Sequence, residues 1–154
     1  MKIKELMTSD VRYCSPSTNL AAAAKIMWEA DCGAIPVADE RGKVIGMITD
    51  RDICIAGATR ARGEGEIPVQ DVISQELYTC APGDDVRAAL EIMKTRKVRR
   101  LPVVDNSGRL AGIVSIHDIA LKSRTNKSAE LSPDAVLETF IAITAPARTF
   151  AASA

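Results

Sequence analysis

The sequence is poor in aromatic residues and has a single histidine, and both shortages narrow the range of functions. It contains one Trp, two Tyr and two Phe in 154 residues, so stacking platforms for single-stranded nucleic acid are scarce. The one imidazole, His117, leaves no readable Ser/His/Asp set for nucleophilic catalysis. Neither a P-loop nor a GxGxxG motif occurs. We therefore expect no enzyme activity.

Net charge and long apolar runs are missing as well. The 20 basic and 20 acidic residues cancel, so no overall field attracts nucleic acid or an anionic membrane. No apolar run approaches the roughly 20 residues that a transmembrane helix needs, and the first ten residues, MKIKELMTSD, lack the apolar centre of a signal peptide. These absences predict a cytoplasmic protein with neither a nucleic-acid nor a membrane partner.

The cysteines give no sign of a metal site. The four of them (Cys14, Cys32, Cys54 and Cys80) form no CxxC pair, and cysteine is more often a small buried hydrophobic residue than a ligand or a nucleophile. We expect reduced thiols and no metal.

The sequence does contain a long internal repeat. A shift of 66 residues places Cys14 on Cys80 and Pro36 on Pro102, without a gap. Solenoids usually need about three or more repeats for stability. Two copies are therefore expected to pair face to face and bury one shared interface.

The sequence pattern of each copy predicts the same order of elements, β-α-β-β-α. Apolar residues at helical spacing indicate helices over 20–30 and 86–96. Strands follow over 34–39 and 100–105, then over 44–49 and 110–115, with a glycine in each intervening turn. A second helix is expected to begin at Asp52 or Asp118, and a short strand to precede each unit near 12–14 and 78–80. The fold class is α/β (α+β).

The domain boundaries follow from this pattern. We expect repeat one over 1–60, a polar and glycine-bearing linker over 61–69, repeat two over 70–125 and a helical tail over 126–154. The tail is expected to contain an amphipathic helix over 133–144.

One polar motif occurs in both copies where a strand gives way to a helix: Thr49-x-x-Asp52 and Ser115-x-x-Asp118. A hydroxyl followed three residues later by a carboxylate is typical of a helix capping box. The same place also suits a ligand, because exposed helix N–H groups bind anions and a carboxylate accepts hydrogen bonds from a sugar diol. The two interpretations are compatible, and both stay open at this point.

The motif lies within a longer pattern that resembles a known family. Copy two reads RRLPVVDNSGRLAGIVSIHDI and copy one reads GAIPVADERGKVIGMITDRDI, and both resemble the cystathionine β-synthase (CBS) domain, whose tandem pair is called a Bateman module. The resemblance implies a pseudo-twofold pair of β-α-β-β-α repeats. It also implies regulation and two clefts that bind adenosine nucleotides, AMP, ADP or ATP, with S-adenosylmethionine or NAD as alternatives. It implies no required cofactor. Because the module fills most of the chain, we expect a stand-alone module that acts on a separate regulated protein.

The resemblance also implies that each cleft is built across both copies. The residues carried over to one cleft are Ser115, Asp118, Ile113 and Arg100 of copy two with Cys14, Asn19, Cys32 and Gly33 of copy one. The residues carried over to the other are Thr49, Asp52, Met47 and Ala34 with Cys80, Asp85, Val98 and Arg99. Backbone amides near Cys14 and Cys80 are expected to read adenine. We expect the first cleft to bind phosphates better, because it holds Arg100 where copy one has Ala34.

Three further interpretations concern the module as a whole, its oligomeric state and its basic stretch. The alternative function is a constitutive interaction scaffold whose clefts stay empty. A lone Trp28 on a helix with the small residues Ala21–Ala24 predicts a homodimer contact. The basic stretch Lys94–Arg100 has no groove-reading motif beside it and is interpreted as a helix end and cleft wall.

Overall fold

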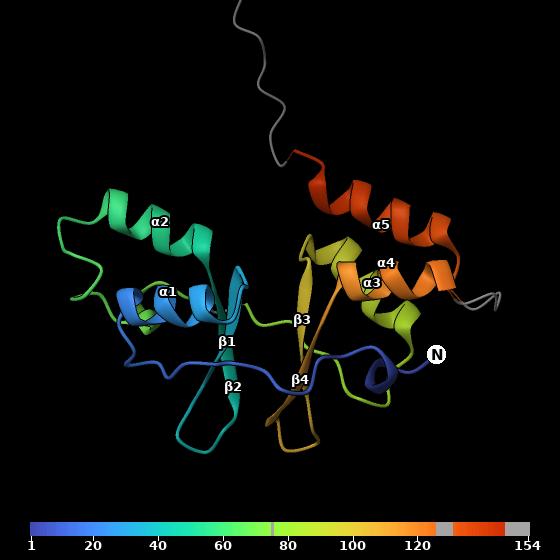
Figure 1. The fold of residues 1–154 in the computed structure, drawn as a ribbon, viewed down its shortest axis with the longest axis horizontal. Coiled ribbons are helices and arrows are strands. Elements are labelled where there is room, and N and C mark those ends of the chain that lie inside the picture. Colours follow the sequence, from blue (N-terminus) through green and yellow to red (C-terminus); the bar gives the residue numbers. More distant parts are fainter. Residues whose placement is uncertain (75, 126–130, 147–154) are drawn as a thin grey trace, which may run out of the picture.

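Two copies of one unit lie side by side in the structure, a computed structural model that describes residues 1–74, 76–125 and 131–146 (Figure 1). Copy one consists of α1 (Leu20–Glu29), β1 (Ala34–Ala38), β2 (Val44–Thr49) and α2 (Asp50–Thr59). Copy two consists of α3 (Val86–Arg96), β3 (Arg100–Val104), β4 (Leu110–Ser115) and α4 (Ile116–Thr125). Two short 3-10 helices (Ile3–Glu5 and Val69–Asp71) and a last helix α5 (Pro133–Thr144) complete the described chain. The predicted fold class is confirmed.

The first helix of each copy forms where a capping residue precedes an apolar face. Asn19 accepts a hydrogen bond from the Ala22 amide at the start of α1, and Asp85 accepts one from the Arg87 amide at the start of α3. Each side chain satisfies one amide that the first helical turn leaves without a partner. The buried faces are Leu20, Ala23 and Met27 in α1, and Val86, Ala89, Leu90 and Met93 in α3.

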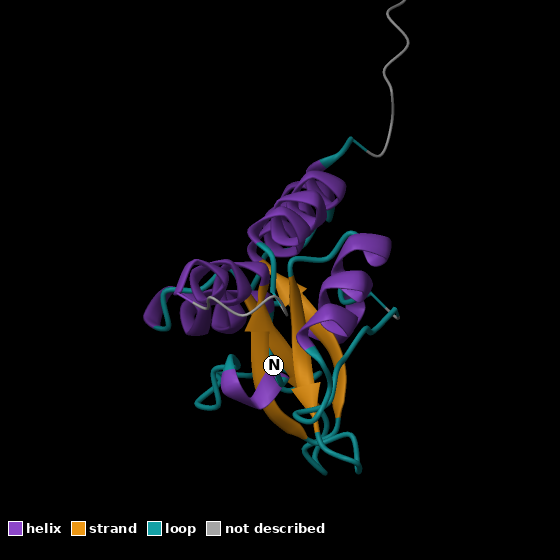
Figure 2. Cartoon of the chain, turned by 90° about the vertical axis from the view of Figure 1, so that its right-hand side faces the viewer, coloured by secondary structure: helices purple, strands orange, loops and turns teal. Residues whose placement is uncertain are grey.

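Each copy has a two-stranded antiparallel hairpin. Gly42 and Gly108 turn these hairpins with φ of 76° and 78°, values that favour glycine because it has no Cβ. The same turns join the copies: Val44 N donates to Gly108 O (3.0 Å) and Leu110 N donates to Gly42 O (3.3 Å). The strands consequently gather in the middle of the molecule, with helices around them (Figure 2).

The short first strand predicted for each copy is wrong. Cys14 makes only one isolated parallel bridge, to Val37, and Cys80 makes the matching one to Val103. In copy one the bridge would extend backward by a hydrogen bond donated from the amide of Pro36, and forward by one donated from the amide of Pro16. Neither proline has an amide hydrogen. Pro102 and Pro82 block the ladder in copy two at the same two places.

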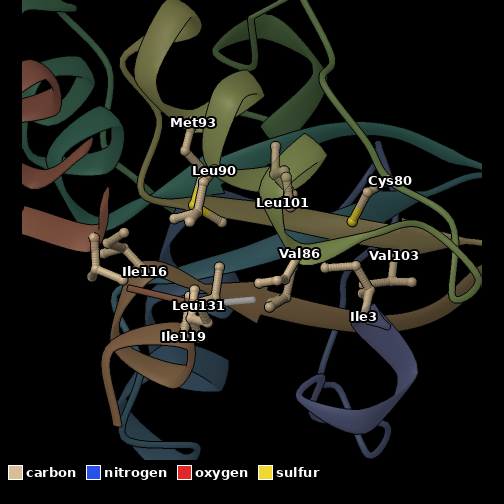
Figure 3. Packing of buried hydrophobic residues seen from close by; sticks show 13 residues of the cluster. Ile3, Cys80, Val86, Leu90, Met93, Leu101, Val103, Ile116, Ile119 and Leu131 are labelled. Atoms are coloured by element: carbon tan, nitrogen blue, oxygen red, sulfur yellow. The ribbon is translucent and has the colours of Figure 1, made fainter. Parts of the chain in front are cut away.

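The N-terminal segment packs on copy two, although copy one follows it in the chain. Ile3 is fully buried in the copy-two core, beside Val86 and Val103 (Figure 3). Its amide donates to Asp84 O (3.0 Å), and Thr8 exchanges two hydrogen bonds with Ile113 at the edge of β4 (2.9 Å each).

The segment before copy two packs on copy one in the same way. Ile67 and Val69 are fully buried in the copy-one core. The Leu20 amide donates to Ile67 O (3.0 Å), and the Val69 amide donates to Thr18 O (2.8 Å). Ile67 and Val69 fall at the end of the predicted linker, and each copy is therefore completed by the segment that precedes the other.

Helix α5 breaks the symmetry because it covers copy two alone. Leu131, Val136 and Thr139 are buried against this copy, and Lys94 of α3 lies 3.5 Å from Glu138 of α5. Among the described residues, no helix covers the corresponding α1–α2 face of copy one. Nor does any described helix have the length and apolar character needed to cross a bilayer.

Candidate functional site

The corner between β2 and α2 forms a complete capping box. Thr49 Oγ1 accepts a hydrogen bond from the Asp52 amide (3.1 Å), while Asp52 Oδ2 accepts one from the Thr49 amide (3.0 Å). The Thr49 hydroxyl also donates to the same carboxylate oxygen (2.6 Å). The capping interpretation is therefore confirmed at this corner.

The corner between β4 and α4 repeats this geometry. Ser115 Oγ accepts from the Asp118 amide (3.2 Å), and Asp118 Oδ2 accepts from the Ser115 amide (2.8 Å) and hydroxyl (2.6 Å). In both boxes every hydrogen bond that the carboxylate accepts ends on Oδ2, and no described residue donates a hydrogen bond to Oδ1. Each half-buried carboxylate therefore keeps one acceptor oxygen for another donor.

A cavity of about 440 Å³ lies against the first corner, and we call it the Asp52 cleft. Copy one contributes Ala34, Met47, Thr49 and Asp52 to its wall. The opposite wall is the turn from α3 into β3, together with Tyr78 and the segment that precedes it. A molecule in this cavity would contact both copies at once.

A second cavity, of about 340 Å³, lies against the other corner, and we call it the Asp118 cleft. Copy two contributes Ile113, Ser115 and Asp118. The opposite wall comes from the turn from α1 into β1 and from residues 8–12. The two clefts are related by the same 66-residue shift as the sequence.

Most of the predicted site residues line these clefts. The Asp52 cleft contains Thr49, Asp52, Met47, Ala34, Val98 and Arg99, all from the set predicted for it. The Asp118 cleft contains Ser115, Asp118, Ile113, Arg100 and Cys32 from its own set. Arg100 and Ala34 line both clefts. The premise behind the predicted phosphate preference is therefore wrong, because Arg100 is not confined to the Asp118 cleft.

Two predicted residues, Cys14 and Cys80, lie in the cores and line neither cleft. The Cys14 amide donates to Pro36 O (3.0 Å) and the Cys80 amide to Pro102 O (3.2 Å), so these two amides are not available to read adenine. Burial raises the pKa of the Cys14 thiol to about 11. Burial, and then the Asp84 carboxylate, raises that of Cys80 to about 12.

Three further predicted residues also lie outside the clefts, because each has a local structural role. Asn19 caps α1 (2.8 Å to the Ala22 amide). Asp85 caps α3 and lies 3.7 Å from the N-terminal amine; the hydrogen bond from the Arg87 amide is the main cause that lowers its pKa. Gly33 faces the start of α2, where its carbonyl accepts from the Asp50 amide (3.1 Å).

Sequence reasoning missed a group of cleft residues on the α–β turns and the segments before each copy. In the Asp52 cleft they are Val72, Ser74, Glu76, Tyr78, Arg96 and Lys97, and in the Asp118 cleft Thr8, Asp10, Val11, Arg12, Ala30, Asp31 and Ile35. The repeat offered a signal for them. Each residue predicted for one turn has a counterpart 66 residues away, and extending the prediction to the whole turns would have added Ala30, Asp31, Arg96 and Lys97.

Tyr78 gives the Asp52 cleft an aromatic wall, where its counterpart in the other cleft is Arg12. The Arg96 guanidinium lies 4.9 Å from the centre of the Tyr78 ring, within cation–π range. The Tyr78 hydroxyl donates to Glu76 (2.7 Å), and this hydrogen bond is the main cause that raises the pKa of Tyr78. The ring is therefore held at the cleft wall by contacts at its face and at its hydroxyl.

The two clefts differ in charge. The Asp52 cleft has four cationic residues (Arg96, Lys97, Arg99 and Arg100) and two carboxylates (Asp52 and Glu76). The Asp118 cleft has two cationic residues (Arg12 and Arg100) and three carboxylates (Asp10, Asp31 and Asp118). No cluster of three or more His, Cys, Asp or Glu suited to a metal ion occurs within residues 1–74, 76–125 and 131–146.

Comparisons with known proteins agree with this architecture. The CBS domain family matches the chain twice, over residues 3–58 and 69–124. The CBS domain-containing protein YhcV of Bacillus subtilis is 39% identical over 127 residues, which cover 82% of this chain and 89% of YhcV.

Two solved structures show the same fold. Hypoxic Response Protein I with two coordinated zinc ions is 30% identical, with a TM-score of 0.73 over 79% of this chain and 98% of that one. The CBS domain pair of protein MJ0100 in complex with 5'-methylthioadenosine and S-adenosyl-L-methionine is 25% identical, with a TM-score of 0.69 over 79% and 98%. The duplicated α-β-β-α unit, the paired corners and these matches lead to one assignment: the chain belongs to the CBS domain family, as a tandem pair.

Proposed function

We propose that the chain is a regulatory module that binds adenosine derivatives, AMP, ADP or ATP among them, in the Asp52 and Asp118 clefts. One observation carries this proposal: each cleft joins the capping corner of one copy to the α–β turn of the other. The free Oδ1 of each aspartate is placed to accept hydrogen bonds from ribose hydroxyls. The related MJ0100 pair, which holds two adenosine derivatives, supports this ligand class.

The proposed mechanism is linkage and includes no chemical step. A ligand that contacts both copies favours one relative arrangement of them, and a partner that prefers that arrangement binds more tightly. The exposed helical faces are the surfaces on which a regulated protein would detect the change.

We also propose that the chain forms a homodimer through the uncovered α1–α2 face. Trp28 on this face is 87% exposed and Ile55 is 48% exposed, whereas α5 covers the matching face of copy two. Light scattering during size-exclusion chromatography is expected to show a dimer that Trp28→Arg converts to a monomer. A monomeric wild-type chain would contradict this part of the proposal.

The experiment on binding is calorimetric titration with adenosine, AMP and ATP. Asp52→Ala and Asp118→Ala are each expected to weaken binding in one cleft by roughly 1.5–3 kcal/mol, the usual contribution of a hydrogen bond to a charged group. Both changes also remove part of a helix cap. Ser132→Ala, which removes the α5 cap outside both clefts, is the control and should leave binding unchanged.

Two results would count against the function. If neither aspartate substitution alters a measured titration, the ligands bind elsewhere. If no adenosine derivative binds the wild-type chain at all, the chain is better described as a constitutive interaction scaffold.

A further inference from the structure

The difference in charge between the clefts affects which ligands each one binds. We infer that the Asp52 cleft selects phosphorylated adenine nucleotides, whereas the Asp118 cleft selects adenosine derivatives without phosphate, uncharged or cationic. The inference rests on the proposed function and divides its ligand class between the two sites.

The cationic residues of the Asp52 cleft come largely from one turn. Arg96 ends α3, Lys97 follows in the left-handed conformation, and Arg99 directly precedes β3. All three belong to copy two, so they face the Asp52 corner across the cleft. A ribose held at Asp52 would leave its phosphates directed toward guanidinium and ammonium groups, which bind phosphate strongly.

The matching turn of copy one has no cation. Its residues are Ala30, Asp31 and Gly33 in place of Arg96, Lys97 and Arg99. Asp31 and Asp10 add two carboxylates to the wall that faces Asp118. A phosphate there would meet like charge at short range, which disfavours it, whereas a neutral nucleoside carries no such penalty.

The remaining cations do not reverse this difference. Arg100 lines both clefts and so favours neither. Arg12 occupies the position of Tyr78, so the Asp118 cleft gains one cation where the Asp52 cleft has its aromatic ring. Lys97 Nζ donates to Ala145 O over 3.4 Å, a long contact between exposed groups that leaves the ammonium able to turn to a phosphate.

The repeat supplies a matched pair of variants that exchange the residues at two positions of the turns and leave Arg99 and Gly33 unchanged. Arg96→Ala with Lys97→Asp gives copy two the residues of copy one, and Ala30→Arg with Asp31→Lys does the reverse. Asp31 and Lys97 have φ of 48° and 54°, so each exchange keeps a residue type already accommodated in that backbone conformation. Both variants leave the capping boxes intact.

The experiment titrates ATP and adenosine into the wild-type chain, the two exchange variants, Asp52→Ala and Asp118→Ala. We expect ATP affinity to fall roughly 10-fold or more in Arg96→Ala/Lys97→Asp, since two charges facing a polyphosphate are lost or reversed. Adenosine affinity in the Asp118 cleft should stay within about twofold. The reverse exchange should create a second ATP site. Of the two aspartate variants, only Asp52→Ala should weaken ATP binding.

Salt dependence is a second measurement that does not depend on how well a variant folds. ATP affinity of the wild-type chain should fall as NaCl rises, because screening weakens its charge contacts, while adenosine affinity should not.

The outcomes separate this inference from the function on which it rests. ATP affinity that is unchanged in Arg96→Ala/Lys97→Asp, or that is lost in Asp118→Ala and kept in Asp52→Ala, overturns the inference and leaves adenosine binding in place. If ATP and adenosine both fail to bind the wild-type chain, the proposed function fails, and the inference fails with it.

Discussion

At the scale of single residues, the four thiols occupy different environments. Cys14 and Cys80 are each 4% exposed, whereas Cys54 is exposed and Cys32 lies partly open at the wall of the Asp118 cleft. Only the thiolate reacts with disulfide reagents. With pKa values of about 11 and 12, Cys14 and Cys80 are almost wholly protonated at pH 8.

We therefore expect Cys54 and then Cys32 to react with a chromogenic disulfide at pH 8, and Cys14 and Cys80 to react only in denaturant. Adenosine should slow the reaction of Cys32 but not that of Cys54, which does not line the Asp118 cleft. Peptide mapping of the labelled protein identifies each site. A fast reaction at Cys14 or Cys80 in the native chain would show that the cores are more open than the structure indicates.

Gly46 and Gly112 occupy equivalent places, yet alanine is expected to be costlier at Gly112. A Cβ there would lie 2.8 Å from the Thr8 carbonyl oxygen, a backbone atom, and 2.9 Å from Met7 Sδ. At Gly46 it would meet only side-chain atoms of Ile73, the nearest being Cδ1 at 2.9 Å. Overpacking costs about 1–3 kcal/mol when the backbone has to move.

Gly112→Ala should accordingly lower the free energy of unfolding by an amount in this range, and Gly46→Ala by less, as urea titration of both variants would measure. Equal losses of unfolding free energy in the two variants would mean that the backbone near Thr8 moves as easily as the Ile73 side chain.

At the scale of elements, the C-terminal segment that contains α5 should stabilise the fold through its buried side chains and not through its exposed ones. Leu131, just before the helix, is 2% exposed in the copy-two core, while Leu137 on its outer face is 56% exposed. We expect Leu131→Ala to cost about 2–5 kcal/mol of unfolding free energy, as buried leucines do. Leu137→Ala should change it by no more than about 0.5 kcal/mol. Thermal or urea unfolding of the two variants measures the difference. A large loss of unfolding free energy in Leu137→Ala would indicate that the outer face of α5 is already covered, for instance in an oligomer.

The main helices and the hairpins were predictable because their signals are local. The spacing of Leu20, Ala23 and Met27 predicts α1, and β2 and β4 have the predicted bounds. The strand expected near Cys14 was wrong because a strand needs a partner able to donate, and Pro36 cannot.

Packing between segments was not predictable. The repeat shows that Ile3 and Val69 are equivalent. It does not show that Ile3 packs in the core of copy two and Val69 in the core of copy one. For the same reason the α–β turns carrying Asp31 and Lys97 were not recognised as cleft walls, although the corners they face were.

At the scale of the whole molecule, the exchanged segments make the two copies interdependent. A fragment of residues 1–66 lacks Ile67 and Val69, and a fragment of residues 67–154 lacks Ile3, all of which are fully buried. We expect each fragment alone to be unfolded by circular dichroism and near-ultraviolet spectra, and a mixture of the two to regain structure.

The control is an intact chain with four glycine or serine residues inserted after Ala61, in an exposed stretch. Lengthening a surface loop adds little entropy cost, so this chain should unfold in one cooperative transition close to that of the wild type. A fragment of residues 1–66 that folds by itself would show that the two cores are independent.

The shared walls of the two clefts also bear on how a duplicated gene of this kind can diverge. Substitutions in the turn after α3 alter the Asp52 cleft, which belongs to the corner of copy one. Substitutions in the turn after α1 alter the Asp118 cleft, which belongs to the corner of copy two. A mutation in either descendant of the ancestral unit can therefore change the ligand preference of both pockets, and the two halves have to diverge together.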